Sequence, residues 1–219
     1  MGSYRPRHGT DSLILVEIEI KEMIRNIIID FGGVLVRLDK SASIQAYCEL
    51  GMDAVAALIN DYHSDGIFRQ LEHGEIDIRQ FCDEARRLTG INASDEAIED
   101  AWLRLLVGVP HERLEKILEL RKKYRVFLLS NTNAFHWDYS VKEYFKDTDI
   151  YFEKMYLSYK LGLTKPDRRM FEYLLADAGI NPHESLLLDD SADNCKAAEE
   201  LGIHTLLIGK DEDWTKFDI

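Results

Sequence analysis

The chain has 219 residues, of which 46% are hydrophobic and 31% are charged, a composition typical of a soluble globular protein with one core or a core plus a modest insertion. Its formal net charge of −13 argues against nucleic acid or an anionic membrane surface as a partner, and its apolar stretches are too short to span a membrane. The cysteines, Cys48, Cys82 and Cys195, are too few and too scattered for a disulfide framework or a zinc site, so we expect reduced thiols and a cytoplasmic location.

The first 22 residues are interpreted as an extension of the folded part. Residues 1–12 are polar, and the apolar stretch that follows them is too short for a secretory signal. Residues 13–20 nevertheless favour an edge strand, because polar and apolar residues alternate from Glu17 onward. Met23 lies just before the first long apolar run, so we expect it to be the natural start and residues 1–22 to be flexible.

A run of aliphatic residues at 27–29 ends in a single carboxylate, Asp30, which is followed by Phe31, Gly32 and Gly33. A continuous aliphatic run is typical of a buried strand in a parallel sheet. Open α/β sheets place their ligands at the carboxyl ends of such strands, and a glycine turn lets the backbone approach a ligand closely. The pattern therefore predicts that Asp30 is a nucleophile or a metal ligand.

Between Val36 and Pro110 we find no strand-like run, only amphipathic helices. Residues suited to cap these helices are Ser41, Asp77 and Ser94 at the N-terminal ends and Gly90 at a C-terminal end. A helical insertion of about 70 residues is far longer than an ordinary loop. We therefore expect a helical cap over residues 39–110, placed above the tips of the strands.

Beyond residue 110, apolar runs alternate with helical segments. Runs at 126–129, 186–188 and 205–208 end at polar residues or glycine, residues 155–157 form a plausible further strand, and helices are predicted over 111–123, 167–178 and 192–201. Alternating strands and helices indicate βαβ units and a parallel sheet. The predicted fold class is α/β, with a Rossmann-like core formed by residues 23–38 and 111–219.

The carboxyl ends of parallel strands meet at one edge of a sheet, and polar residues follow several of the predicted strands. We expect that edge to gather Asp30, Ser130, Asn131, Asp189 and Asp190, together with Lys165, which stands before a helix predicted to open at Pro166. The carboxylates repel each other, and a hard divalent cation such as Mg²⁺ suits oxygen ligands of this kind. The hydroxyl, amide and amine groups are donors suited to phosphate oxygens.

A charge count makes the metal a requirement of this interpretation. A phosphate dianion and three carboxylates would carry five negative charges, of which Lys165 offsets one. Each charge–charge interaction at ~4 Å is worth roughly 1–4 kcal/mol near a protein surface. Without Mg²⁺ the site would therefore hardly bind its ligand.

Four segments together resemble the motifs of the haloacid dehalogenase (HAD) superfamily, in the same order along the chain. They are Asp-Phe-Gly-Gly-Val-Leu at 30–35, Leu-Ser-Asn-Thr-Asn at 129–133, Lys-Pro at 165–166 and Asp-Asp-Ser-Ala-Asp-Asn at 189–194. The helical insertion resembles a type-1 cap. Its segment 68–76 is similar to that of bacterial sugar-phosphate phosphatases, such as those acting on glucose 1-phosphate, and the phosphatase domain of epoxide hydrolases is also similar.

The resemblance implies a role for each site residue. Asp30 would attack phosphorus and form an aspartyl-phosphate. Asp30, Asp190 and the backbone carbonyl of Gly32 would bind Mg²⁺. Ser130 and Asn131 would hold the phosphoryl oxygens, and Lys165 would neutralise the charge that develops in the transition state. Asp189 would orient Lys165, and Asn194 would support the metal site.

Gly32 departs from the pattern of most phosphatases in this superfamily, which carry a second Asp at this position. That Asp protonates the leaving group and later activates water, and losing such a group costs typically 10²–10⁴-fold in rate. Three interpretations follow: a residue of the cap or a nearby loop replaces the acid, the leaving group needs little protonation, or the protein is a weak or lapsed enzyme. We favour the first two together, with a sugar 1-phosphate as substrate. Candidate replacements are His63, Glu72, His73 and His136.

The predicted function is that of a Mg²⁺-dependent phosphomonoesterase acting on a small phosphorylated metabolite, as a monomer or a homodimer. One alternative is a metal-independent 2-haloacid dehalogenase, which also uses an Asp nucleophile, although Gly32 and the Asp189–Asp190 pair argue against it. A second alternative is a non-catalytic phosphate-binding protein.

Overall fold

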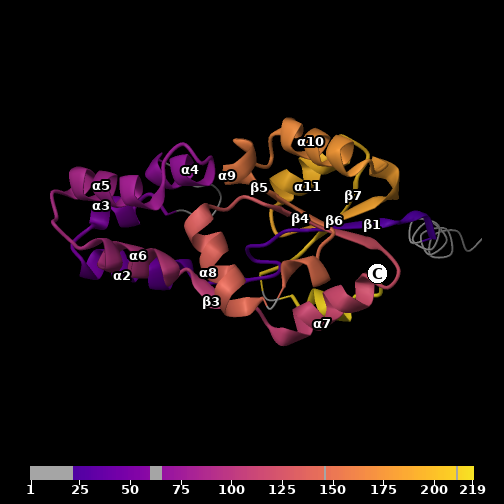
Figure 1. The fold of residues 1–219 in the computed structure, drawn as a ribbon, viewed down its shortest axis with the longest axis horizontal. Coiled ribbons are helices and arrows are strands. Elements are labelled where there is room, and N and C mark those ends of the chain that lie inside the picture. The colour runs from indigo at the N-terminus through magenta and orange to yellow at the C-terminus, as the bar shows by residue number, and fades with distance from the viewer. Residues whose placement is uncertain (1–21, 60–65, 146, 211) are drawn as a thin grey trace, which may run out of the picture.

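The core of the chain is a parallel sheet whose strands follow the predicted apolar runs. A computed structural model describes residues 22–59, 66–145, 147–210 and 212–219. Within these residues the sheet has the strand order β5-β4-β1-β6-β7 (Figure 1). Its strands are β1 (Asn26–Ile29), β4 (Arg125–Ser130), β5 (Lys154–Leu157), β6 (Ser185–Asp189) and β7 (His204–Leu207). The predicted α/β fold class with a Rossmann-like parallel sheet is confirmed, and so is the further strand near residue 155.

The strand β1 lies at the centre of the sheet and is buried along its whole length. Ile29 pairs with Leu128 on one side and Leu188 on the other, so β4 ends two residues and β6 one residue beyond the end of β1. Because side chains alternate along a strand, Ile27 and Ile29 pack on one face of the sheet and Ile28 on the other. This register brings three strand ends to the same place.

Helices cover both faces of the sheet (Figure 1). One face packs against α7 (His111–Leu120), and the opposite face packs against α10 (Arg168–Ala178) and α11 (Ala192–Glu199). The remaining described helices of the core are α8 (Ala134–Tyr144), α9 (Ser158–Leu161), η1 (Thr148–Ile150), η2 (Pro182–Glu184) and η3 (Trp214–Lys216). The helix α10 begins at Arg168, within one residue of the predicted range 167–178, but its N-cap is Asp167 and Pro166 lies before the N-cap instead of opening the helix.

The cap forms a separate layer of helices with its own apolar core. It contains α2 (Lys40–Glu49), α3 (Asp53–Ala56), α4 (Gly66–Glu72), α5 (Ile78–Thr89) and α6 (Asp95–Leu103). Tyr47, Phe68, Phe81 and Trp102 are the large side chains buried between these helices. Figure 1 shows the cap standing to one side of the sheet, beside α8.

Three of the four predicted helix caps are confirmed. Asp77 makes a capping box with Gln80, Ser94 accepts a hydrogen bond from Ala97 N, and Gly90 ends α5 in the left-handed conformation. The N-cap of α2, however, is Asp39 and not Ser41. The Asp39 carboxylate accepts hydrogen bonds from both Ala42 N and the Ser41 hydroxyl, so the carboxylate takes the capping role and the helix begins earlier than predicted.

The expectation of no strand between Val36 and Pro110 is wrong. Two short strands, β2 (Arg37–Leu38) and β3 (Leu106–Gly108), pair antiparallel where the chain enters and leaves the cap. Strands of two and three residues are too short to show a periodic pattern, and their pairing joins residues that are distant in sequence. They hold the two connections of the cap together.

Two predictions concern residues 1–22, at the N-terminal end of the chain. The flexible extension and the edge strand at 13–20 lie outside the described residues, apart from Glu22. In the described part of the chain, no helix has the length and apolar character needed to cross a membrane.

Candidate active site

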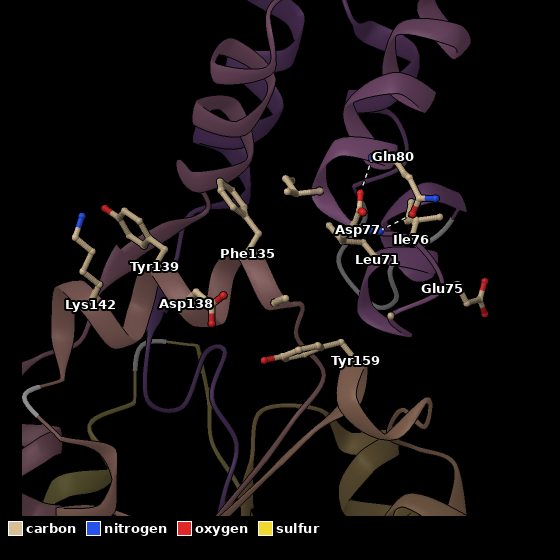
Figure 2. A pocket seen from close by; sticks show the side chains of 13 residues that line it. Leu71, Glu75, Ile76, Asp77, Gln80, Phe135, Asp138, Tyr139, Lys142 and Tyr159 are labelled. Carbon is tan, nitrogen blue, oxygen red and sulfur yellow. Dashed lines mark hydrogen bonds between the residues drawn. The ribbon is translucent and has the colours of Figure 1, made fainter.

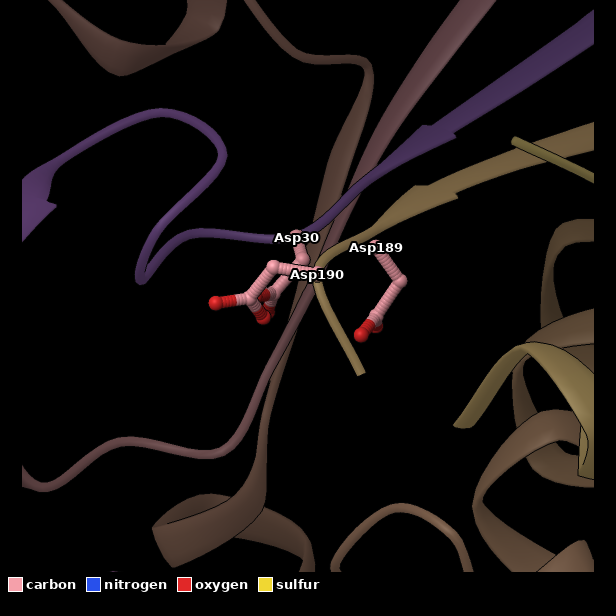
Figure 3. A group of neighbouring side chains, drawn as sticks. All are labelled: Asp30, Asp189 and Asp190. Carbon is pink, nitrogen blue, oxygen red and sulfur yellow. The ribbon is translucent and has the colours of Figure 1, made fainter. Parts of the chain in front are cut away.

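Three carboxylates converge at the carboxyl edge of the sheet (Figure 3). Asp30 follows β1, its backbone N–H donates to Leu188 O at 2.9 Å, and Asp189 is the last residue of β6. Carboxylate oxygens of Asp30, Asp189 and Asp190 all lie within 4.8 Å of one another. The neighbouring ends of β1 and β6 thus produce the predicted acidic cluster.

A buried lysine joins two of these carboxylates. Lys165 Nζ donates to Asp30 Oδ1 at 2.7 Å and to Asp189 Oδ2 at 2.6 Å. Burial lowers the pKa of Lys165, but the carboxylates of Asp189 and Asp30 outweigh burial and raise that pKa above its ordinary value. The lysine therefore stays charged and bridges Asp30 to Asp189.

The Asp189 carboxylate is engaged at both oxygens. Its Oδ2 accepts from Lys165, and its Oδ1 accepts from Ser191 N and from Asn194 Nδ2, each at 2.9 Å. Asp189 is completely buried. These contacts suit the orienting role predicted for Asp189, and they place Asn194 beside Asp189. Asp30 and Asp190 are consequently the better candidates for binding a cation.

Asp30 has a strongly perturbed pKa. Burial raises the pKa of Asp30 to about 8 against the effect of Lys165, and Asp189 and Asp190 add to the rise. Burial and the neighbouring Asp189 also raise the pKa of Asp190. The cluster carries three acidic groups and one lysine, so a divalent cation would balance it.

Gly33 allows Asp190 to occupy this place. Its φ is +77°, and a Cβ on Gly33 would lie 2.1 Å from Asp190 Oδ2. Arg113, buried on α7, donates to the carbonyls of Gly33 and Leu35 at 3.3 Å each and so holds this loop from behind. The sequence pattern indicated a flexible glycine turn here but carried no signal for the contact with Asp190 or for Arg113.

A Cβ could be added at Gly32 if the end of one neighbouring side chain moved slightly. In the described part of the chain, a Cβ on Gly32 would meet only Leu38, whose Cδ1 lies 3.1 Å away at the end of a flexible side chain. The glycine at this position is therefore not required by local packing. Binding of a metal by its carbonyl stays a prediction.

The end of β4 supplies the polar groups predicted to hold phosphate. Ser130 is completely buried and its Oγ has no hydrogen-bond partner among the described residues. The Asn131 side chain is already engaged, because its Nδ2 donates to Lys165 O and its Oδ1 accepts from Lys165 N, both at 2.8 Å. Asn131 thus fixes the backbone that carries Lys165, and its predicted contact with phosphate stays a prediction.

A cavity of about 870 Å³ lies over this edge of the sheet, between the cap and the core. The core contributes Asp30, Gly32, Asn131, Lys165 and Asp190 to its lining, and the cap contributes Phe68, Arg69, Glu72, His73 and Trp102. A second, mostly apolar cavity of about 700 Å³ lies between the cap turn around Gly74 and α8, with Phe135, Tyr139 and Tyr159 on its core side (Figure 2). The acidic cluster opens into the first cavity.

The structure shows the surroundings of three of the four residues predicted to replace the acid that is absent at Gly32. His136 is buried, its Nε2 lies 3.2 Å from Trp102 O, and burial lowers its pKa to about 3, so it serves as a neutral packing residue. Glu72 and His73 line the cavity, and His73 Nε2 lies 3.2 Å from Thr164 Oγ1. His63 lies outside the described residues.

A family model for haloacid dehalogenase-like hydrolases matches residues 24–202. The chain belongs to this family, and the family predicted from the four motifs is confirmed. A D-ribitol-5-phosphate phosphatase from Bacteroides thetaiotaomicron is 37% identical over 196 residues, which are 88% of this chain and 95% of that protein.

Solved structures of the family are also similar over most of their length. A HAD family enzyme from Bacteroides thetaiotaomicron, in complex with magnesium and inorganic phosphate, has a TM-score of 0.82 and 41% identity over 87% of this chain and 97% of its own. A HAD-like family hydrolase from Porphyromonas gingivalis has a TM-score of 0.80 and 34% identity over 88% and 94%.

Proposed function

We propose that this hydrolase is a Mg²⁺-dependent phosphomonoesterase that uses Asp30 as its nucleophile. The observation that carries the proposal is the placement of Asp30 at a strand end, bonded to the buried Lys165 and beside Asp190. The relative named as a phosphatase and the similar structure holding magnesium and phosphate support it.

The chemistry of the proposed reaction has two steps. Asp30 forms a bond to phosphorus while the bond between phosphorus and the leaving oxygen breaks, and the leaving oxygen takes a proton. Water then attacks the phosphorus of the aspartyl-phosphate and gives a proton to the group that protonated the leaving oxygen, while the bond between Asp30 and phosphorus breaks, so phosphate is released and Asp30 is restored. Lys165, held between Asp30 and Asp189, would neutralise charge on the transferring group in both steps.

The residues of the site fit a magnesium ion. Asp30 and Asp190 supply hard oxygen ligands, the Gly32 carbonyl is the predicted third protein ligand, and Lys165 offsets only one of the three carboxylates. When bound, Mg²⁺ would offset the repulsion between the carboxylates and the phosphate. Ser130 fits the phosphate itself, because its buried hydroxyl has no partner in the described residues and would gain one.

A polyol or sugar phosphate is the proposed substrate class. The name of the bacterial relative specifies ribitol 5-phosphate, a primary alkyl ester, whose alkoxide leaving group needs a proton. For this chain we therefore favour such an ester over the sugar 1-phosphate expected from Gly32 alone. Glu72 and His73, both in the cavity lining, are the proposed sources of that proton.

Hydrolysis of p-nitrophenyl phosphate tests the proposal. We expect turnover with Mg²⁺, loss of turnover with EDTA, recovery when Mg²⁺ is restored, and background rates for Asp30→Asn. The control is Asp193→Asn, which removes an exposed acid that lines the same cavity, and this variant should retain activity. Halide release from 2-haloacids in EDTA would instead support the dehalogenase alternative, and phosphate binding without any turnover would support a non-catalytic protein.

A further inference from the structure

One wall of the cavity is built from three aromatic rings that come from different helices. Phe68 lies on α4, Trp102 on α6 and His136 on α8, and all three line the cavity. The ring centroids of Trp102 lie 4.5 Å from those of both Phe68 and His136. These contacts hold the Trp102 ring between the cap helix α4 and the core helix α8.

Trp102 carries a buried hydrogen-bond donor, its indole N–H, which these ring contacts leave without an acceptor among the described residues. Trp102 is 4% exposed, and its Nε1 has no hydrogen-bond partner among the described residues. The contrast with Trp214 is direct, since Trp214 Nε1 donates to Val34 O at 2.8 Å. Buried tryptophan N–H groups usually find a partner, so an unpaired one on a residue that lines the cavity points to a ligand.

The backbone of Trp102 is held independently of its ring nitrogen. His136 Nε2 lies 3.2 Å from Trp102 O, and this contact connects the core helix to the cap helix. Because the depressed pKa of His136 leaves it with a single ring proton, Nε2 is the donor in this contact. The position of Trp102 is therefore fixed by its backbone contact and its two ring contacts, while its buried N–H has no partner among the described residues.

We propose that Trp102 Nε1 donates a hydrogen bond to a hydroxyl of the substrate's carbon chain, and that Trp102 is a specificity-determining residue for polyhydroxylated phosphate esters. This inference rests on the proposed phosphomonoesterase function. Phosphate binds at Asp30 and Lys165, while Trp102 and Phe68 on the cap receive the remainder of the ester. A site built to bond a hydroxyl rejects an analogue that lacks it, because the donor is then left unpaired.

Two esters of equal chain length isolate the hydroxyl contact. The wild-type kcat/KM is measured for ribitol 5-phosphate and for n-pentyl phosphate, and we expect a clear preference for the hydroxylated ester. Trp102→Phe removes the N–H and keeps an aromatic ring. It should lower kcat/KM for ribitol 5-phosphate about tenfold or more and change the value for n-pentyl phosphate by less than about twofold.

Trp137→Phe is the matched control. Trp137 is also a buried tryptophan, but it belongs to the apolar core on the face of the sheet that packs against α7, and it is not part of the cavity lining. We expect it to leave the preference between the two esters unchanged. If Trp102→Phe does not fold, 3-benzothienylalanine at position 102 replaces the N–H by sulfur with nearly the same ring shape.

The outcomes separate this inference from the proposed function. Equal losses on both esters would overturn the role of Nε1 and leave the phosphatase proposal standing, because the wall would then act by packing alone. If the wild type hydrolyses neither these esters nor p-nitrophenyl phosphate, the phosphatase proposal fails. Calorimetric titration with the same two ligands then decides the inference: a preference for ribitol 5-phosphate that Trp102→Phe removes supports it, and the absence of that preference overturns it.

Discussion

At the scale of single residues, the position of Asp190 depends on the absence of a side chain at Gly33. Gly33 adopts a positive φ and approaches Asp190 so closely that even a methyl group would overlap a carboxylate oxygen. A substitution there has two costs, the backbone strain of a left-handed conformation and the displacement of Asp190. Only the second cost concerns the reaction.

Gly33→Ala should therefore abolish Mg²⁺-dependent turnover, with a loss larger than its effect on folding. Gly179→Ala provides the control, because Gly179 also has a positive φ, +62°, and no described atom lies within 4 Å of its Cβ position. Both variants should lose about 1 kcal/mol of unfolding free energy from strain. Phosphatase assays and urea unfolding measure the two effects, and equal activity of the two variants would contradict this explanation.

At the preceding residue, Gly32, a substitution can add a catalytic group instead of disturbing one. Gly32→Asp introduces the carboxylate that most phosphatases of the superfamily carry, and the Cβ of the new side chain would meet only the flexible end of Leu38 in the described surroundings. If proton transfer to the leaving group limits the rate, turnover of alkyl phosphates should rise by up to about 10²-fold relative to p-nitrophenyl phosphate, whose leaving group needs no proton. Gly32→Ala, which adds bulk without the acid, should show no such selective gain.

At the scale of elements, the cap is joined to the core by more than its two strand connections. Ser158 begins α9 in the core, and its Oγ lies 2.6 Å from Glu72 O in the cap and 2.8 Å from Thr132 O in the core. The same oxygen accepts a hydrogen bond from Thr132 N at 3.0 Å. A hydroxyl has one proton, so it donates to one carbonyl at a time and can remain bonded to Thr132 if the cap moves away.

Ser158→Ala should lower the free energy of unfolding by about 1–3 kcal/mol, because it leaves the buried Thr132 N–H unpaired. It should also speed hydrogen exchange at the cap turn that follows α4. Ser140→Ala is the matched control, since Ser140 is equally buried and its Oγ makes no hydrogen bond within the described residues. That variant should be neutral or stabilising. Destabilisation of similar size in both would attribute the effect to lost packing.

The sequence predicts features that depend on local pattern and misses those that depend on contacts across the fold. Asp30 at a strand end follows from an aliphatic run, and the sheet follows from alternating segments. The bonds from Asn131 to the Lys165 backbone join residues 34 positions apart, and the contact of Gly33 with Asp190 spans a larger separation. Such pairs have no periodic signal, so the family motifs located the residues while the structure revealed which groups they touch.

At the scale of the whole molecule, the cap and the sheet each have an apolar core, and the cavity lies between them. The folded core brings like charges together at Asp30, Asp189 and Asp190, and Lys165 offsets only one of them. The native state without metal therefore contains electrostatic repulsion that the unfolded chain does not. A cation that binds the folded site alone must raise the stability of the whole protein.

Mg²⁺ should accordingly raise the melting temperature, by an amount equivalent to about 2.7 kcal/mol at a concentration 100-fold above its dissociation constant. Asp190→Asn should abolish this increase and, because it removes one of the repelling charges, should melt slightly higher than the wild type in EDTA. Asp193→Asn, which changes an exposed acid of α11 in the same cleft, should keep the Mg²⁺ response. Calorimetric melting of the three proteins with Mg²⁺ and with EDTA measures both effects, and an undiminished Mg²⁺ response in Asp190→Asn would place the cation elsewhere.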